Sequence, residues 1–378
     1  MNADAPTSSG RTRSQWLMML ALNAMLMIAL YIYKLLYNIP GEVYTQLLAD
    51  YHFGFIKRAL LGALTGLLFP TLPVWSPYVP GTLILLVTCG LFFLAFRKII
   101  GFRAETLPVL VFTAGSPVFL KNFIQTLGYF DIYGCAAALL LLIVPARSLA
   151  YIALAAVLAV LLNLIHHIQT LLYLPTIIAI VVVRFYLVQR RRISLADVLL
   201  GGGLLALIGG LFLYTQLYGN VPVPREEFTA YLQSRISDPA FRSYLSTDIY
   251  YNTLAKEISH TWTILPKNLL RLPVYAAIIA CHAPLIACFL NSMRQLDTGS
   301  RRFILVALTL ITLAYLIVFA IVFDYARWYS NWATCMILMF FTMQYLATTR
   351  SSIADTPAAR RFGWITSLIP RVGTTIPF

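Results

Sequence analysis

Uninterrupted apolar runs constrain this chain more than any other feature of its sequence. The runs SQWLMMLALNAMLMIALYIYKLLYN (14–38) and FILVALTLITLAYLIVFAIVF (303–323) reach the roughly 20 residues that an α-helix needs to cross a bilayer. Of the 378 residues, 60% are hydrophobic and 11% are charged, whereas soluble domains carry about 25% charged residues. We therefore predict an all-α polytopic membrane protein.

Ten apolar segments are predicted to span the membrane. A shorter stretch, 59–73, contains Gly, Pro and Thr and is predicted to form an interfacial or re-entrant helix. We expect a single transmembrane domain over 1–350, with a long external segment at 220–271 between the seventh and eighth spans and a basic cytoplasmic tail at 351–378. The predicted spans are 15–38, 81–97, 105–120, 123–145, 148–165, 168–187, 193–219, 272–293, 303–323 and 329–348.

The distribution of basic residues gives the predicted orientation. The chain has 28 Lys and Arg against 14 Asp and Glu, a net charge of +14. In a polytopic membrane protein such an excess collects in short cytoplasmic loops, so it requires no nucleic-acid partner. The short connections 190–192 (RRR) and 301–302 (RR) are therefore placed inside, and the even number of spans puts both termini in the cytoplasm.

Under this topology, polar side chains from four distant parts of the chain converge on the external membrane surface. Ionisable groups at the edge of the hydrocarbon are costly, so they usually pair, line a watery cavity or bind a ligand. The external face is therefore the predicted working face. The converging residues are Glu42, Asp50, His52, Lys57 and Arg58 after the first span, Asp131 at the start of the fourth, His166 and His167 between the fifth and sixth, and Asp324 and Arg327 between the ninth and tenth.

These groups also have purely structural interpretations. Asp50 is suited to capping the following helix or pairing with a nearby cation, and the acid and arginine of DYARW are spaced to form an ion pair across a turn. Adjacent histidines on a helix cannot point the same way, so at most one of His166 and His167 is expected to face a cavity. Asp131 is the hardest to explain structurally, because no cation lies within one helical turn of it.

Short motifs with specific chemistry are absent from the sequence. It contains no phosphate-cradling P-loop, no GxSxG, no HExxH and no paired CxxC, so nucleotide chemistry on the cytoplasmic side is not expected. The five cysteines all fall inside apolar segments, which argues against a disulfide framework and a zinc site. An external enzyme without cytosolic nucleotides usually takes an activated group from a lipid carrier.

A polyprenyl-linked sugar donor on the external face needs three kinds of protein group. Its phosphate needs cations at headgroup depth, its tail needs an apolar groove, and the acceptor hydroxyl needs a carboxylate to deprotonate it. Segment 59–73 and its neighbouring spans are suited to the groove, and Asp50 or Asp131 to the carboxylate. The candidate cations are Lys57, Arg58 and Arg327.

On these residues the chain resembles the GT-C class of membrane glycosyltransferases, which use lipid-linked sugars. The shared features are an acid in the first external loop, Glu42 or Asp50, an amphipathic stretch after it, and the long external segment 220–271. The resemblance implies a polyprenyl-phosphate-linked sugar donor and a glycan or lipid-linked acceptor. The chain also resembles uncharacterised bacterial membrane proteins of envelope-polysaccharide biosynthesis, through GFIKR (54–58), FD (130–131), HHIQTLLYLP (166–175) and DYARW (324–328). That likeness implies a location in the bacterial inner membrane.

The resemblance also implies roles for individual residues. Asp50 becomes the general base, the three cations hold the lipid phosphate, and Asp131 and one of the two adjacent histidines orient the acceptor sugar. His52 and Asp324 have supporting roles. Part of the class uses a divalent metal such as Mg or Mn, for which Asp50 and His52 are candidate ligands. The chain departs from the class in one respect, because Glu42 and Asp50 are eight residues apart where members often have near-adjacent acids.

Three other function classes stay open. A transporter or flippase for an anionic glycolipid usually has its site near the midplane on broken helices, often with internal repeats, and the sequence shows few midplane charges and no visible repeat. A membrane acyltransferase would use His166 or His167 as its base, but that histidine would have to be reachable from the cytoplasm. A non-catalytic partner in polysaccharide assembly would keep the same external surface around a degenerate site.

Overall fold

Residues 8–189, 191, 193–322 and 324–350 are described by the computed structural model. Over these residues the fold is helical, apart from an isolated parallel bridge between Leu72 and Ile236. The predicted all-α class is thereby confirmed. The predicted cytoplasmic tail, 351–378, lies outside the described residues, as do two of the three arginines of the RRR loop.

Several helices of the described chain are long and apolar enough to cross a membrane. Four qualify on their own, and the pair α14 (Leu254–Leu269) and α15 (Leu272–Cys281), bent by 62°, makes a fifth if it is counted as one span. This supports a membrane protein, with fewer continuous membrane-length helices than the ten predicted. The four are α1 (Ser8–Tyr37), α4 (Tyr78–Ile99), α11 (Leu195–Tyr218) and α17 (Thr298–Ile321).

The difference arises because several predicted spans are divided into shorter helices. In the predicted span 123–145, α6 (Leu120–Gln125) and α7 (Asp131–Ile143) are separated by a loop in which Gly128 has φ +91°, a left-handed conformation that favours glycine. In the predicted span 272–293, α15 gives way to α16 (Ala283–Arg294). The first turn of α16 contains a proline, which has no N–H to continue the preceding helix.

Shorter helices make up much of the rest of the described chain. The predicted span 168–187 is also divided, and its last part is π-helical. The segment 59–73, predicted to be interfacial, contains a nine-residue helix. The remaining helices are α2 (Gly41–Leu48), α3 (Leu60–Leu68), η1 (Ala104–Thr106), α5 (Leu107–Ala114), α8 (Leu149–Ile165), α9 (Gln169–Leu172), α10 (Leu174–Val181), η2 (Val182–Leu187), α12 (Arg225–Ser234), η3 (Pro239–Tyr244), α13 (Asp248–Tyr251) and α18 (Tyr325–Arg350).

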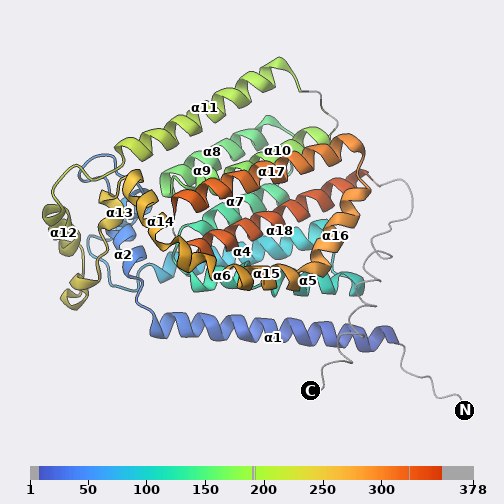
Figure 1. Ribbon diagram of the computed structural model, residues 1–378, viewed down its shortest axis with the longest axis horizontal. Helices are drawn as coiled ribbons and strands as arrows, with labels where there is room; N and C mark the ends of the chain where they lie inside the picture. The colour runs from blue at the N-terminus through green and yellow to red at the C-terminus, as the bar shows by residue number, and fades with distance from the viewer. Residues whose placement is uncertain (1–7, 190, 192, 323, 351–378) are drawn as a thin grey trace, which may run out of the picture.

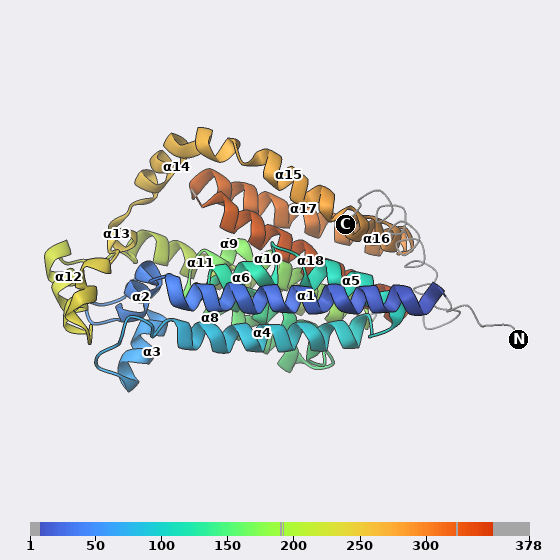
Figure 2. The ribbon, with the colours of Figure 1, turned by 90° about the horizontal axis from the view of Figure 1, so that it is seen from below.

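The long helices run roughly side by side as a bundle, and short helices cover one end of it (Figure 1). We call this the capped end; it contains α2, α12 and α13. α1 begins and α18 ends at the opposite end. The buried helix α7 lies inside the bundle and packs most extensively against α4. Figure 2 shows α1 passing over the outside of the bundle, and Figure 1 shows α11 along another edge.

α1 and α11 present apolar side chains outward. In the most apolar part of each helix, 6% of the residues are buried. On α1, Leu22 and Ile28 are 53% and 59% exposed, and on α11, Leu199 is 67% exposed. Because apolar surface left in water costs about 25 cal/mol per Å², these two helices are suited to a lipid environment, and lipid molecules are the neighbours that we expect around them.

A buried arginine lies at the end of the bundle opposite the capped end. Arg184, in the π-helical turn η2, is 2% exposed. Its Nη1 donates to the carbonyl oxygens of Leu141 and Val144, the latter at 2.6 Å. Its guanidinium carbon lies 5.6 Å and 4.7 Å from the ring centroids of Tyr151 and Tyr345. Arg184 therefore binds carbonyl groups that the C-terminal end of α7 leaves free.

The capped end has an apolar core of its own. Tyr44 of α2 packs with Phe228 of α12 and Tyr250 of α13, and all three are fully buried. The first turn of α3 packs directly against the backbone that follows α2. A Cβ on Gly62 would lie 1.8 Å from the carbonyl oxygen of Ala49. Only glycine permits this approach. The segment after the first predicted span is therefore held firmly against the predicted external segment.

Candidate functional site

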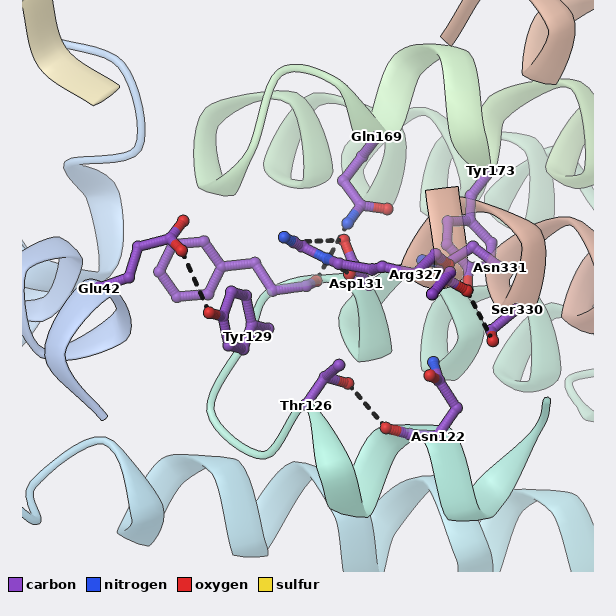
Figure 3. Close-up of polar contacts among 12 residues, drawn as sticks. Glu42, Asn122, Thr126, Tyr129, Asp131, Gln169, Tyr173, Arg327, Ser330 and Asn331 are labelled. Atoms are coloured by element: carbon purple, nitrogen blue, oxygen red, sulfur yellow. Dashed lines mark hydrogen bonds and ion pairs between the residues drawn. The ribbon is translucent and has the colours of Figure 1, made fainter. Parts of the chain in front are cut away.

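A buried ion pair joins two of the predicted site residues near the capped end. Asp131 opens α7, and Arg327 lies in the first turn of α18. The Arg327 guanidinium donates to both carboxylate oxygens, through Nε to Oδ2 and through Nη2 to Oδ1 at 3.0 Å. The Arg327 and Asp131 side chains are 9% and 1% exposed. Asp131 has no cation close to it in the sequence, and in the structure its partner is an arginine of α18 (Figure 3).

Neutral side chains around this pair hold the starts of α7 and α18 in place. Gln169 Nε2 donates to the carbonyl oxygen of Phe130 at 3.0 Å, immediately before α7. The Tyr173 hydroxyl donates to Asn331 Oδ1 at 2.7 Å and so links α9 and α10 to α18 (Figure 3). Sequence reasoning did not single out these residues, although Gln169 and Tyr173 lie inside the quoted motif HHIQTLLYLP.

Of the two acids in the predicted first external loop, Glu42 is the one that lies in this cluster. Its Oε2 accepts a hydrogen bond from the Tyr129 hydroxyl at 3.1 Å (Figure 3). The Tyr129 ring in turn lies 4.5 Å from the guanidinium carbon of Arg327. Glu42 Oε1 lies 3.9 Å from Arg58 Nη1, and the Glu42 side chain is 34% exposed. Glu42 Oε1 also accepts a hydrogen bond from Gln46 Nε2 at 3.2 Å. Glu42 is thus partly exposed, lies near Arg58, and is linked to Arg327 through the Tyr129 ring.

Asp50 belongs to a different set of contacts. Its Oδ2 accepts hydrogen bonds from Arg235 Nη1 and from the Tyr231 hydroxyl, each at 2.6 Å, and its Oδ1 accepts from the backbone N–H of His52 at 2.9 Å. The His52 ring stacks on Tyr231 with centroids 4.5 Å apart. Arg235 also donates to the carbonyl oxygen of Leu48. Asp50 and His52 therefore tie the first loop to the predicted external segment, through partners that sequence reasoning missed.

Lys57 and Arg58 lie beneath the predicted external segment. Lys57 is 6% exposed, and its Nζ donates to the carbonyl oxygen of Asn252 at 3.4 Å. Burial, together with the neighbouring charge of Arg58, lowers the pKa of the Lys57 ammonium to about 8. Arg58 has φ +63° and is the non-glycine residue with positive φ in the described chain. Such backbone costs about 1 kcal/mol or more unless its surroundings maintain it, so Arg58 is held in place by its neighbours.

The two adjacent histidines lie between α8 and α9 and differ in their partners. His166 is 1% and His167 is 6% exposed, and their rings stack with centroids 5.9 Å apart. His167 Nε2 lies 3.0 Å from Gln216 Oε1, whereas neither ring nitrogen of His166 has a hydrogen-bond partner. Burial, with the charges of Arg58 and Arg327, lowers the pKa of His166 well below its ordinary value. His166 is therefore neutral at physiological pH.

Asp324 lies just before α18 and is partly buried. Burial raises the pKa of its carboxyl group, and the charge of Arg327 opposes that rise. The strong ion pair of Arg327 is with Asp131, not with Asp324 as the spacing in DYARW suggested. The alternative interpretation of DYARW as a local ion pair therefore does not account for Arg327, which pairs with the more distant and more buried Asp131.

Several buried polar atoms near the capped end have no hydrogen-bond partner in the protein. Leaving a buried polar atom unpaired costs about 1–3 kcal/mol, so each one requires an explanation. Together they give this end of the bundle a capacity for hydrogen bonding that the fold itself does not use. These atoms include Arg58 Nε, Asn122 Nδ2, His166 Nδ1 and Nε2, His167 Nδ1, Gln169 Oε1, Arg235 Nη2, the Tyr250 hydroxyl and Asn252 Oδ1.

A divalent metal finds no ready set of ligands in the described residues. Nowhere among them do three or more His, Cys, Asp or Glu side chains group in a way that could hold a metal ion. The candidate ligands Asp50 and His52 are two residues apart, and both Asp50 oxygens already accept hydrogen bonds, one of them from the backbone N–H of His52. The residues present therefore do not fit a metal site at this position.

Comparisons with known proteins identified no relative of this chain. No protein-family model, curated protein or solved structure matches this chain. The resemblance to the GT-C class therefore depends on the short motifs and their arrangement, and function has to be inferred from the polar cluster itself.

Proposed function

We propose that this chain is a membrane glycosyltransferase or polysaccharide polymerase that moves a sugar from a polyprenyl-phosphate-type donor on the external face. The observation that carries the proposal is the cluster of buried charged and polar side chains at the capped end of an apolar helical bundle. Charged groups at such a position are costly and are typical of functional sites. A carboxylate beside several cations is suited to transferring a group whose leaving atom belongs to a phosphate.

The proposal includes a topology. The capped end faces outside, the opposite end and both termini are cytoplasmic, and the broken segments complete ten crossings of a bacterial inner membrane. Helices divided by loops are tolerated at membrane depth when neighbouring helices satisfy the freed backbone groups. The long apolar helices support the membrane assignment, and the basic short connections support the orientation.

The acceptor hydroxyl needs a carboxylate that is open to it. Both acids accept hydrogen bonds on both oxygens, but Asp50 pairs with Arg235 at 2.6 Å and its side chain is 19% exposed. Glu42 lies 3.9 Å from Arg58, and its side chain is 34% exposed. We therefore assign the general base to Glu42, the other acid that the resemblance allows. As the hydroxyl oxygen bonds to the anomeric carbon of the donor sugar, the bond from that carbon to the phosphate oxygen breaks. Glu42 takes the hydroxyl proton, and the electron pair leaves with the lipid phosphate.

The other members of the cluster have proposed roles in binding. Lys57, Arg58 and Arg327 provide the positive charge that stabilises the leaving phosphate. Asp131 and His166 orient the acceptor sugar. His166 is preferred to its neighbour for this role because its two ring nitrogens have no protein partner.

The first experiment measures sugar transfer by the purified protein in proteoliposomes supplied with labelled polyprenyl-linked sugars. Glu42→Gln removes the base and keeps the shape, so transfer should fall by about 10²–10⁴-fold. Asp50→Asn should retain most of the activity, and Glu226→Gln, at an exposed acid on α12, is the control and should match the wild type. A fully active Glu42 variant would remove the base assignment. Transfer lost only in the Asp50 variant would return that role to Asp50.

A transporter or flippase for an anionic glycolipid is the second candidate. The observation in its favour is the set of broken helices, including the 62° bend between α14 and α15, since transporters often bind substrate at such breaks. Labelled glycolipid that crosses the bilayer without being chemically changed would favour this candidate. If the wild type neither transfers nor moves any labelled substrate, a non-catalytic role in polysaccharide assembly becomes the better proposal.

A further inference from the structure

An apolar cavity lies between α15, α16, α17 and α18. Its volume is about 320 Å³, and Val118, from the loop between α5 and α6, also lines it. The described residues that line it include no Asp, Glu, Lys or Arg and no member of the polar cluster around Asp131. Those contributed by α18 recur every three or four residues and so follow one face of that helix. They are Tyr329, Trp332, Ala333, Met336, Ile337 and Phe340.

The cavity is open along α18. Trp332, Ala333 and Met336 are partly exposed, whereas every other residue of α18 between Tyr329 and Met343 is buried. The helix that covers the cavity, α15, is itself hardly packed. None of its ten residues, all of which the structure describes, is buried. Figure 2 shows α14, α15 and α16 following one another along the outer side of α17.

α15 is held to the bundle near its two ends. Toward its start, the Tyr275 ring stacks on the Tyr329 ring with centroids 4.5 Å apart, and the Tyr329 hydroxyl donates to the carbonyl oxygen of Tyr275 at 3.1 Å. Just after its end, His282 Nε2 lies 2.9 Å from Ser116 Oγ. Between these contacts, Ile278 lines the cavity. α15 is therefore a cover that is fixed at two points, and the cavity lies beneath it.

The polar groups of the cavity wall are already paired. Three of the described lining residues have a nitrogen or oxygen atom in the side chain. His282 and Tyr329 use theirs in the contacts that hold α15, and His282 Nδ1 donates to the carbonyl oxygen of Ile278 at 2.7 Å. Trp332 Nε1 donates to Thr312 Oγ1 at 3.3 Å. Since a bound water needs two to four polar partners, the cavity is suited neither to water nor to a charged headgroup.

The size of the cavity points to a hydrocarbon occupant. The cost of an empty cavity rises with its volume, and a cavity of roughly 150 Å³ in a soluble protein already binds benzene. Phe340 follows Tyr329 by eleven residues on α18, a distance of about 16 Å along the helix. One leaflet of a bilayer has a hydrocarbon thickness of about 15 Å, half of the whole core. The cavity therefore matches the length of one phospholipid acyl chain, and a much longer chain would extend beyond it.

We propose that this cavity binds one acyl chain of a phospholipid from the surrounding bilayer. The chain enters beside α15, and its headgroup stays at the membrane surface. The outward side of α15 supports this source, because Leu272 and Val274 are 52% and 58% exposed and are suited to contact with the same lipid. The proposal depends on the membrane assignment alone and uses none of the residues of the proposed glycosyltransferase site.

The experiment uses the full-length protein in phosphatidylcholine vesicles that contain a trace of phosphatidylcholine with a diazirine on one acyl chain. After illumination, the labelled residues are identified by mass spectrometry. Label is expected on Met336 in the cavity as well as on Ile28, which faces outward on α1. Ala333→Trp places an indole ring in the cavity and should lower the labelling of Met336, relative to Ile28, roughly ten-fold. Ala206→Trp adds the same bulk at an exposed position of α11 and should leave the ratio unchanged.

Further outcomes decide the proposal. Ala333→Leu adds less bulk and should give a smaller loss of label, which keeps the test decisive if the tryptophan variant does not fold. Absence of label from Met336 in the wild type, or equal labelling ratios in the Ala333 and Ala206 variants, would overturn the site. Farnesyl phosphate, added as a minor component of the vesicles, should not change the labelling of Met336. If it removes most of that label, the cavity prefers an isoprenoid chain and the phospholipid assignment is wrong. None of these measurements involves sugar transfer, so their failure is distinguishable from failure of the proposed function.

Discussion

The two ends of the bundle both bury an arginine, and they use it differently. At the end opposite the cap, Arg184 donates to two carbonyl oxygens and lies over two tyrosine rings, although its Nε has no partner. At the capped end, the buried Arg327 donates to both oxygens of Asp131, while the half-buried Arg58 and the buried His166 keep several polar atoms unpaired. The comparison teaches that burial of a charge does not by itself indicate function. A better indicator of a functional site is a group of buried hydrogen-bonding atoms that have no partner in the protein.

The largest expected effect tests the buried ion pair of Asp131 and Arg327. Asp131→Ala leaves the Arg327 charge buried without a partner and should lower the free energy of unfolding by about 3–5 kcal/mol. The double variant Asp131→Ala with Arg327→Met should recover much of that loss, because neither charge is then left alone. Unfolding of the detergent-solubilised protein measures both. A single-variant loss below about 1 kcal/mol would show that the pair does not hold the bundle together.

The next effect concerns Lys57 and pH. The pKa of its ammonium is 10.5 in the unfolded chain and about 8 in the folded protein, so between these values the unfolded state binds the extra proton. Stability should therefore rise as pH increases from about 8 toward 10, by up to about 3 kcal/mol. The midpoint of thermal unfolding, Tm, measures this rise. Lys57→Met should abolish it, and an identical pH dependence in that variant would contradict the buried position of Lys57.

A smaller effect is expected at the opposite end of the bundle. Arg184→Met removes hydrogen bonds from a charged donor to two carbonyl groups and should destabilise the protein by about 2 kcal/mol. Because Arg184 lies away from the capped end, sugar transfer per folded molecule should be unchanged. Activity and Tm of the same preparation test both statements. If the Arg184→Met variant had normal stability but low activity, Arg184 would have a functional role, and the proposed difference between the two ends would be wrong.

The smallest effect has the opposite sign. His166→Leu replaces an unpartnered buried imidazole with an apolar side chain, so the protein should become more stable by about 1 kcal/mol while it loses transfer activity. Gln216→Leu is the matched comparison, since it removes the partner of His167 and should destabilise. If His166→Leu is as destabilising as Asp131→Ala, the imidazole is a structural group and the capped end is not distinguished by unused polar atoms.

The helical class was predictable because long apolar runs have few other solutions in a lipid environment. The number of continuous helices was not. The breaks occur at Gly128, which adopts positive φ, and where α16 begins after α15, and in both cases packing against neighbouring helices decides whether a short helix can remain at that depth. Hydrophobicity along the sequence carries no information on such packing.

The site was predictable in part for a related reason. Because successive predicted spans cross the membrane in opposite directions, the predicted topology placed Asp131, Arg327 and His166 on the same side. The structure brings these residues to the same cluster. The reason for proposing Glu42 rather than Asp50 as the base was not accessible from the sequence. It depends on Arg235, which is 185 residues from Asp50 and occupies its carboxylate. No local spacing rule encodes a contact of that kind.

The broken helices also bear on how the protein is made. α1, α4, α11 and α17 are apolar enough to enter a membrane one at a time as they leave the ribosome, whereas α7 has 13 residues and begins with an acid. The arginine that neutralises Asp131 is 196 residues further along the chain. Until α18 has been synthesised, α7 has no partner for its charge at the membrane. The ion pair that completes the polar end can therefore form only after α18 has been synthesised, and a chain truncated before α18 would leave Asp131 without this partner.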